Sequence, residues 1–250
     1  MTIAIIGLGY VGLPLAVAFA EAGDEVIGLD ADPRKVDAIA AGESYVEDVP
    51  SPRLAAVAQR IRATTSYADV AAADAIVVCV PTPLTANREP DLGPLLDAGQ
   101  RLAAVVRPGQ LVVLESTTFP GTTRERLAPL LEESGLTIGA DLHLAYSPER
   151  VDPGRRDYTL RTTPKIVGGV TPACRERAAA LYRRVCDTVV EVGSPEVAEM
   201  AKLLENIFRS VNIALVNELA IVADRMGIDV REGVDAAATK PYGFMRFDPG

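Results

Sequence analysis

The sequence predicts an α/β fold, in which a doubly wound, mostly parallel sheet is followed by a long central α-helix. Strand-like apolar runs alternate with helical patterns along most of the chain, which is typical of parallel sheets covered by helices. Residues 2–6 form a first strand that ends at a glycine, and a helical pattern then runs to about Ala22. A second strand at Glu25 to Leu29 completes a βαβ unit.

The same alternation continues through the middle of the chain. Further strands are predicted at Ala75 to Val80, Leu111 to Leu114, Leu142 to Ala145, Lys165 to Val167 and Thr188 to Val192, and helices at Leu92 to Val106 and Thr122 to Ser134.

A long helix is predicted to follow the last strand. Ser194 can cap a helix, Pro195 suits its first position and Glu196 interacts favourably with the helix dipole. No proline or glycine follows until Gly227, so this helix could run about 30 residues, on the order of 45 Å. Its second half, Ile213 to Ala223, is apolar on nearly every face, which predicts burial against other domains or another subunit.

These elements divide the chain into a sheet domain at residues 1–193 and a helical dimerisation segment at residues 194–250, whose last stretch from Lys240 is predicted to be a loop.

Composition excludes several classes of partner. The 250 residues carry 25 Lys and Arg against 34 Asp and Glu, a net charge of -9, which argues against nucleic-acid binding. No secretion signal is visible at the start, and no continuous apolar run approaches the roughly 18 residues of a membrane span, so no membrane partner is expected. Cys79, Cys174 and Cys186 lack metal-ligand spacing, which predicts free thiols, no metal site and a cytoplasmic location.

Three glycines predict the first functional site. Gly7, Gly9 and Gly12 form a GxGxxG pattern between a strand and a helix, the context of a Rossmann-type dinucleotide-binding loop. Asp30 ends the second strand, where a carboxylate accepts hydrogen bonds from ribose hydroxyls and repels a 2'-phosphate. NAD is therefore the expected cofactor. An ordinary glycine-rich turn is the alternative, and Arg34 and Lys35 leave NADP open.

Polar loops follow three of the predicted strands. They contain VPTPL from Val80, ESTTFPG from Glu115 and YSPER from Tyr146. Because ligands of open parallel sheets lie outside the carboxyl ends of the strands, these loops are expected to face a nicotinamide and a substrate alcohol. Ordinary turns use the same residue types, which is the alternative interpretation.

The long helix adds further candidates. Lys202, Asn206 and Arg209 stand at i, i+4 and i+7, on one helix face. A solvated stripe would explain the spacing, but the flanking Leu203, Leu204, Ile207 and Phe208 favour partial burial, where a lysine can act in acid/base or oxyanion chemistry. His143, the only histidine, lies in an apolar strand and is expected to be structural.

Taken together, these motifs resemble those of the UDP-glucose/GDP-mannose dehydrogenase family, nearest the branch that oxidises UDP-N-acetylhexosamines. The resemblance covers essentially the whole chain and rests on GLGYVGLPLA at Gly7, VPTPL at Val80, PDL at Pro90, the EST loop with PGTT, YSPERVDPG at Tyr146, KIVGG at Lys165 and EMAKLLENIFRSVNIALVNELA at Glu199.

The resemblance implies a reaction. It is the four-electron oxidation of a sugar C6 alcohol to a carboxylate in polysaccharide biosynthesis, with two NAD molecules used in turn and a cysteine that carries the substrate as a thioester.

It also implies residue roles. The catalytic residues would be Lys202, Asn206, Glu149 and Thr117, with Thr118 as the alternative to Thr117. Cofactor contacts would come from Gly7, Gly9, Tyr10, Val11, Gly12, Asp30, Lys35, Val80, Pro81, Thr82, Ser116 and Thr117. Substrate contacts would come from Glu149, Arg150, Val151, Lys202, Asn206 and Arg209.

One departure from the family pattern matters for catalysis. In the family, the nucleophilic cysteine lies in a glycine-rich loop shortly after the segment matching Phe247 to Gly250, and a C-terminal domain contributes to the UDP-sugar site. Neither is in these 250 residues. We therefore expect a chain cut or diverged before the nucleophile, which binds NAD and a UDP-sugar and forms a homodimer through the long helix without completing catalysis.

Two alternatives stay open at this point. One is an enzyme of the β-hydroxyacid dehydrogenase type, which also pairs a Rossmann domain with a long helix bearing Lys and Asn four residues apart. The other is a module that binds NAD or dimerises without catalysis. Lys240 and Tyr242 stand where some UDP-N-acetylhexosamine enzymes carry His and Arg, which leaves the sugar open as well.

Overall fold

The computed structural model describes residues 1–151 and 158–249. The chain divides into two compact units, Met1–Met200 and Ala201–Gly250.

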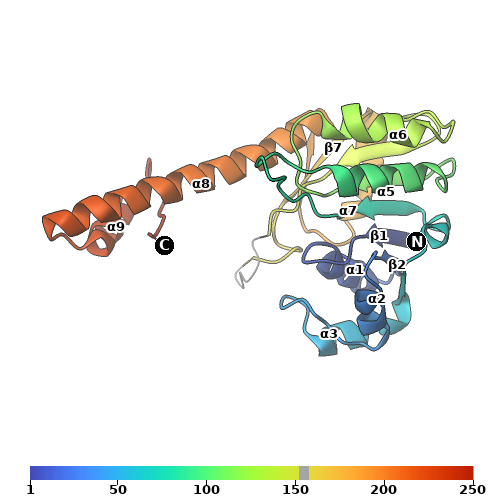
Figure 1. The fold of residues 1–250 in the computed structure, drawn as a ribbon, viewed down its shortest axis with the longest axis horizontal. Coiled ribbons are helices and arrows are strands. Elements are labelled where there is room, and N and C mark those ends of the chain that lie inside the picture. Colours follow the sequence, from blue (N-terminus) through green and yellow to red (C-terminus); the bar gives the residue numbers. More distant parts are fainter. Residues whose placement is uncertain (152–157, 250) are drawn as a thin grey trace. The chain divides into compact units, whose positions relative to one another are not determined.

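The first unit is built on one sheet (Figure 1). Within the described residues the sheet has eight strands in the order β3-β2-β1-β4-β5-β6-β7-β8. The strands are β1 (Thr2–Ile6), β2 (Glu25–Leu29), β3 (Ile61–Thr64), β4 (Ala75–Val78), β5 (Leu111–Leu114), β6 (His143–Tyr146), β7 (Lys165–Gly169) and β8 (Val189–Val192). All neighbouring pairs are parallel except β6 and β7. This confirms the doubly wound, mostly parallel sheet of Rossmann type.

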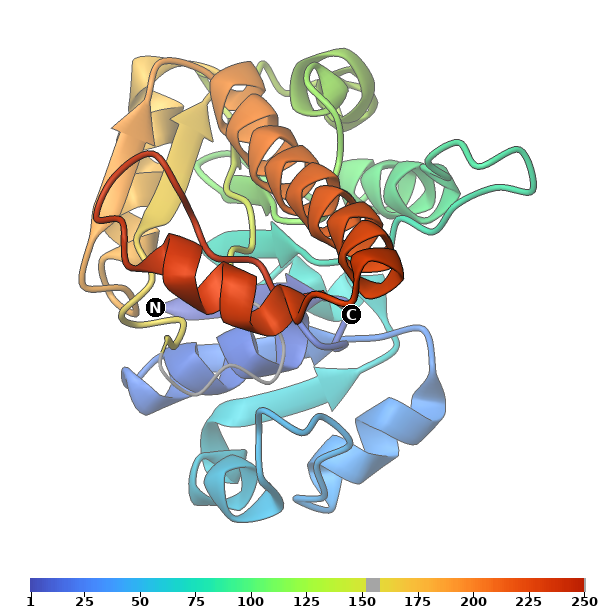
Figure 2. The same cartoon turned by 90° about the vertical axis from the view of Figure 1, so that its left-hand side faces the viewer.

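Helices cover both faces of the sheet (Figures 1 and 2). In the first unit they are α1 (Gly12–Glu21), α2 (Pro33–Ala40), α3 (Ser51–Ala56), η1 (Ala58–Arg60), α4 (Tyr67–Val70), α5 (Gly93–Ala103), η2 (Thr122–Leu127), α6 (Ala128–Glu132) and α7 (Pro172–Tyr182). Ile3 and Ile5 of β1 share a core with α1 and α7, while the alternate side chains of β1 point to the other face. Helices α5 and α6 pack against each other.

Some elements differ from the sequence expectation. Strand β3 was not predicted, because its IRAT sequence is an edge strand with a single buried residue, Ile61. The helix expected over 122–134 begins as the π-helix η2 after Gly121, whose φ is +97°. Helix α9 (Val230–Ala238), capped by the Asp229 side chain, was also not predicted.

The antiparallel pair β6–β7 reverses the chain direction in the sheet. Tyr146 at the end of β6 pairs with Gly168 near the end of β7. Because β7 runs against β6, the first residue of β7, Lys165, lies at the edge where β5 and β6 end. A parallel strand would have placed Lys165 at the opposite edge.

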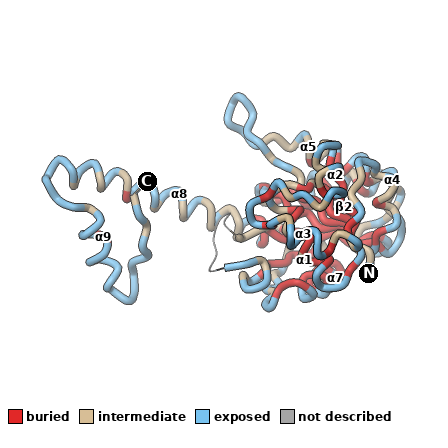
Figure 3. The backbone as a smooth tube through the Cα atoms, turned by 90° about the horizontal axis from the view of Figure 1, so that it is seen from below, coloured by how far each residue is buried: buried red, intermediate tan, exposed pale blue. Residues whose placement is uncertain are grey.

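The long helix α8 (Pro195–Met226) has 32 residues and begins and ends where the sequence predicts. In residues 201–249 only Val216 and Val234 are buried apolar side chains, in contrast to the densely buried sheet unit (Figure 3). Leu204, Ile207 and Phe208, for which partial burial was expected, are exposed in the chain by itself. Although charges interrupt it, α8 meets the length and composition of a membrane-spanning helix, with mean hydropathy 1.3 over its most apolar window.

Candidate functional site

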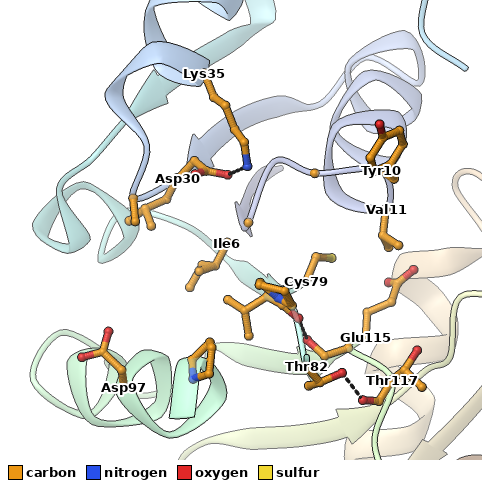
Figure 4. Close-up of a pocket in the computed structure, with 18 of the residues that line it drawn as sticks. Ile6, Tyr10, Val11, Asp30, Lys35, Cys79, Thr82, Asp97, Glu115 and Thr117 are labelled. Carbon is orange, nitrogen blue, oxygen red and sulfur yellow. Dashed lines mark hydrogen bonds and ion pairs between the residues drawn. The ribbon is translucent and has the colours of Figure 1, made fainter. Parts of the chain in front are cut away.

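A cleft of about 740 Å³ opens at the carboxyl ends of the parallel strands (Figure 4). The loops after β1, β2, β4, β5 and β6 all contribute to it. It is lined by the predicted residues Gly7, Gly9, Tyr10, Val11, Asp30, Lys35, Val80, Pro81, Thr82, Ser116, Thr117 and Glu149. The topology therefore brings together residues from five separate segments at one edge, as expected for an open α/β sheet.

The three glycines of the first loop have different steric surroundings. A Cβ at Gly7, whose φ is +90°, would lie 2.6 Å from the carbonyl oxygen of Cys79. A Cβ at Gly12 would lie only 1.8 Å from the carbonyl oxygen of Gly7. A Cβ at Gly9 would meet no protein atom within 4 Å. Gly7 and Gly12 thus serve close packing of the loop, and Gly9 keeps space open inside the cleft.

The amino end of α1 faces this space. Val11 precedes the helix without a side-chain hydrogen bond to it, and the first turn of α1 carries no acidic residue. The first N–H groups of a helix and its dipole attract an anion. An uncapped helix start beside the open space at Gly9 fits a pyrophosphate.

Asp30 has the surroundings expected for a ribose-binding carboxylate. Its Oδ2 accepts hydrogen bonds from the Leu8 amide at 2.8 Å and from Lys35 Nζ at 2.9 Å, and its Oδ1 accepts one from the Asp32 amide at 2.9 Å. Arg34 forms a bidentate pair with Asp32, in which Nε donates to Oδ1 at 3.0 Å and Nη2 donates to Oδ2 at 2.7 Å, and this pair lowers the pKa of Asp32 to about 2. Both basic residues that left NADP open are thus paired with carboxylates, an arrangement that favours NAD.

Two loops are joined on the other side of the cleft. Thr82 Oγ1 donates to the carbonyl oxygen of Thr117 at 2.7 Å, and Ser116 Oγ donates to that of Val80 at 2.7 Å. Figure 4 shows Thr82, Thr117 and Glu115 together there. Thr117 lines the cleft, whereas Thr118 is buried. The geometry therefore favours Thr117 over Thr118 as the cofactor-facing threonine.

A buried charge cluster lies under this part of the cleft, and of its members only Glu149 was a predicted site residue. Lys165 Nζ forms an ion pair with Glu149 Oε2 at 3.2 Å and a closer one with Glu115 Oε1. Tyr182 donates its hydroxyl to Glu115 Oε2 at 2.5 Å. The available signal was a lysine that opens an otherwise apolar strand.

The structure places the other predicted residues differently. Gly12 packs on Gly7 and does not line the cleft. Arg150 donates to the carbonyl oxygen of Pro164 at 2.6 Å, and Val151 lines a second hollow beside α1. Lys202, Asn206 and Arg209 lie on one face of α8 in the second unit, and their roles remain predictions. His143 is a buried strand residue whose pKa is lowered by burial and by Arg177.

The fold and this cleft define an NAD-binding Rossmann domain joined to a long helix. Residues 1–186 match the NAD binding domain of the UDP-glucose/GDP-mannose dehydrogenase family, and residues 196–250 match its central domain. The chain belongs to this family, and NAD is its cofactor. Among the described residues, no cluster of three or more His, Cys, Asp and Glu residues could hold a metal ion.

Several individual proteins are similar to the chain. UDP-N-acetyl-D-glucosamine 6-dehydrogenase of Pseudomonas aeruginosa is 38% identical over all of this chain and 59% of its own length. UDP-N-acetyl-D-mannosamine dehydrogenase of Pyrococcus horikoshii is 40% identical over 96% of this chain and 58% of its own length. A solved structure of UDP-D-ManNAc dehydrogenase from Pyrococcus horikoshii superposes with a TM-score of 0.94 at 39% identity, covering 100% of this chain and 60% of that one. The chain thus spans about three fifths of the length of the curated relatives it matches.

Asp30→Ala should weaken NAD binding about tenfold or more, because the ribose hydroxyls lose their charged acceptor. Calorimetric titration of the variant with NAD measures this. Since alanine also leaves the Leu8 amide without its acceptor, Asp30→Asn is the matched variant. The asparagine keeps an oxygen that can accept from the Leu8 amide but carries no negative charge. Because the charge that repels the 2'-phosphate is gone, the ratio of NAD affinity to NADP affinity should fall in Asp30→Asn. Unchanged NAD affinity in both variants would refute the assignment of Asp30 to the ribose.

Proposed function

We propose that this chain forms the NAD-binding and central portion of a cytoplasmic UDP-N-acetylhexosamine 6-dehydrogenase, which oxidises the sugar C6 alcohol to the uronic acid. One observation carries the proposal. Ser116, Thr117 and Glu149 line the same NAD cleft, and Lys165 links Glu149 to Glu115, which directly precedes Ser116. An alcohol beside the nicotinamide would lie between these residues. The names of the similar proteins support the sugar class, and the free, buried Cys79, Cys174 and Cys186 suit a reducing compartment.

Each part of the cleft has a task in this proposal. NAD, when bound, accepts the hydride from the sugar carbon. The open space at Gly9 and the start of α1 hold its pyrophosphate, and Asp30 holds the adenosine ribose. Thr82 and Ser116 fix the two loops around the nicotinamide end, with Thr117 facing the reacting carbon. Glu149 is a carboxylate that lines the cleft, and it would accept a proton from the substrate and assist the hydrolytic step.

The β-hydroxyacid dehydrogenase alternative makes a different prediction about substrate. To test the two, the 250-residue chain is incubated with NAD and either UDP-N-acetylglucosamine, UDP-N-acetylmannosamine or a small β-hydroxyacid. Ligand-detected NMR and NADH absorbance are followed. We expect NAD-dependent binding of a UDP-sugar and no NADH from the hydroxyacid. NADH formation from the hydroxyacid alone would overturn the proposal, and failure of every UDP-sugar to bind would favour a module without catalysis.

We further propose that α8 joins two copies of the chain. Its exposed apolar side chains recur every three or four residues along one face, and each is at least 45% exposed. This α8 stripe consists of Leu204, Phe208, Val211, Leu215, Leu219, Val222 and Met226. It extends about 33 Å along the helix at 1.5 Å per residue.

The opposite face of α8 has another character. At about 100° per residue, Lys202, Asn206 and Arg209 fall roughly 120° to 180° away from the centre of the stripe. The stripe is thus separated from the polar residues Lys202, Asn206 and Arg209, although Ile213 and Ile221 are exposed apolar residues outside it. The regular spacing of the stripe supports a second copy of the chain as its partner, and leaves Lys202, Asn206 and Arg209 on a face available to a site.

Replacing two central residues of the stripe, Leu215→Glu together with Leu219→Glu, should convert a dimer into a monomer. If the variant stayed a dimer, its apolar interface would have to bury four carboxylates, two from each copy. Sedimentation equilibrium at micromolar concentration measures the state. Ser210→Glu, which adds a charge to an exposed site off the stripe, is the control and should leave the dimer intact. A wild-type monomer under these conditions would contradict the prediction.

A further inference from the structure

Lys165 is a buried cation whose surroundings are unusual for a strand residue. It is only 2% exposed and opens β7, otherwise made of Ile166, Val167 and two glycines. Lysine is almost never fully buried unless its charge is paired. Its ammonium group contacts Glu115 and Glu149 and lies 5.0 Å from the centre of the Tyr182 ring.

The sheet topology explains how Lys165 reaches Glu149. Tyr146 pairs with Gly168 across the antiparallel β6–β7 ladder. Glu149 lies three residues after Tyr146, and Lys165 lies three residues before Gly168, so continuing the ladder sets the two opposite each other. Glu115 directly follows β5, the parallel neighbour of β6. Three adjacent strands therefore converge on a single ammonium group.

The hydrogen bonds to Glu149 favour its ionised form. Its Oε1 accepts the amides of Arg150 at 2.9 Å and Val151 at 2.6 Å, and its Oε2 accepts Lys165. All three of these partners donate hydrogen bonds, which stabilises the ionised carboxylate. None of them could accept a hydrogen bond from a protonated Glu149 carboxyl group. Glu115 and Glu149 both line the cleft. Of the two, only Glu149 has an exposed side-chain fraction, 18%, whereas the Glu115 side chain is fully buried.

We propose that Lys165 is a positioning residue of the active site, which anchors the Glu149 carboxylate at the cleft and keeps it ionised so that it can accept a proton. Glu115 and Tyr182 hold the ammonium group in place from the other side. The inference rests on the proposed function, because only a substrate in the cleft gives the carboxylate a proton to accept. Lys165 itself need not touch that substrate, since it is enclosed by the cluster.

Other titratable groups face the cluster and set the balance. Burial disfavours the charged form of every member. Burial raises the pKa of Glu115. At Glu149, Lys165 and the Val151 amide outweigh the effect of burial, so the pKa of Glu149 is lowered. Burial also disfavours the Lys165 ammonium, but the two carboxylates outweigh it and raise its pKa. The thiols of Cys79 and Cys186 and the phenol of Tyr182 also face the cluster, and burial raises the pKa of each, so they stay neutral near pH 7.

The test is a side-chain titration of the 250-residue chain labelled with ¹³C at glutamate carboxyls. The Glu149 resonance is assigned by its loss in Glu149→Gln. In the wild type, Glu149 should titrate below its ordinary pKa, which is 4.5. In Lys165→Met its pKa should rise by about 1 to 3 units, because an opposite charge at hydrogen-bond distance is lost. In Lys165→Arg, which keeps the charge, and in Glu115→Gln, which removes the competing carboxylate, it should remain low.

Two results would overturn the inference. The first is a wild-type Glu149 that titrates at or above its ordinary pKa, which needs no variant to be folded. The second is an equal Glu149 pKa in Lys165→Met and Lys165→Arg, which would mean that lysine only fills space. Calorimetric titration of the wild type with NAD is run alongside. If the wild type does not bind NAD, the proposed function is refuted. The carboxyl titration decides the role of Lys165 independently of that result.

Discussion

Gly12→Ala should destabilise the sheet unit by about 3 kcal/mol or more, an effect larger than most single substitutions cause. The added Cβ would lie 1.8 Å from the carbonyl oxygen of Gly7 and 3.1 Å from a methyl group of Ile5. The first contact is with backbone that is itself fixed, because the Gly7 amide donates to Leu29 O at 2.7 Å in the sheet. No rotamer change can relieve such an overlap, so α1 must move away from β1. Urea unfolding followed by circular dichroism measures the loss.

Gly9→Ala is the matched control, three residues earlier in the same glycine pattern. Its Cβ would meet no protein atom within 4 Å and its φ is not positive, so the free energy of unfolding should change by no more than about 0.5 kcal/mol. The same methyl group would enter the space assigned to the pyrophosphate, and NAD affinity should fall at least about tenfold. If Gly9→Ala binds NAD normally, or if Gly12→Ala is as stable as the wild type, the steric account of the loop is wrong.

Glu199→Ala should lower the free energy of unfolding of the sheet unit by about 3 kcal/mol or more. The Glu199 carboxylate is fully buried and accepts the amides of Gly121 at 2.7 Å and Thr123 at 2.9 Å, as well as the Thr123 hydroxyl at 2.7 Å. Alanine would leave three donors without an acceptor inside the protein, at about 1 to 3 kcal/mol each. These donors begin η2, directly after the loop that carries Ser116 and Thr117, so the same substitution should also loosen that loop.

Glu196→Ala separates this effect from a general sensitivity of the first turn of α8. Glu196 lies three residues earlier and pairs with Arg124 at 2.7 Å, but both side chains are partly exposed. Exposed pairs contribute at most about 1 kcal/mol. Thermal unfolding and amide exchange of residues 116–123 should therefore change far more in Glu199→Ala than in Glu196→Ala. Equal losses in the two variants would contradict the role given to the buried carboxylate.

Local sequence patterns were sufficient for much of the fold. Strand β1 is a β-branched run stopped by Gly7, and α8 starts at Pro195 and ends before Gly227, both as predicted. In each case one short segment contains both the residues that favour the strand or helix and the glycine that ends it. Strand β3 lacks such a pattern because its side chains are half exposed, and its place beside β2 depends on residues far along the chain.

The candidate site divides in the same way. Gly9 and Asp30 belong to a motif with fixed spacing, and the sequence predicted both for the cleft that they line. Lys165 and Glu115 are 50 residues apart, and they meet only because β7 runs against β6. Strand direction within a sheet depends on tertiary pairing and leaves no local mark in the apolar pattern. Glu199 and its three donors escaped prediction for the same reason.

The sparse interior of the second unit links its order to protein concentration. Residues 201–249 bury only Val216 and Val234 as apolar side chains, and the edge-to-face contact of Phe208 with Phe247 is one of the few ring contacts in that region. Isolated helices are marginal in water, so the far half of α8 gains most of its stability from whatever covers it. By mass action, dilution below the dissociation constant of a dimer would fray this unit. The sheet unit, with its own core, would keep its melting temperature under the same dilution.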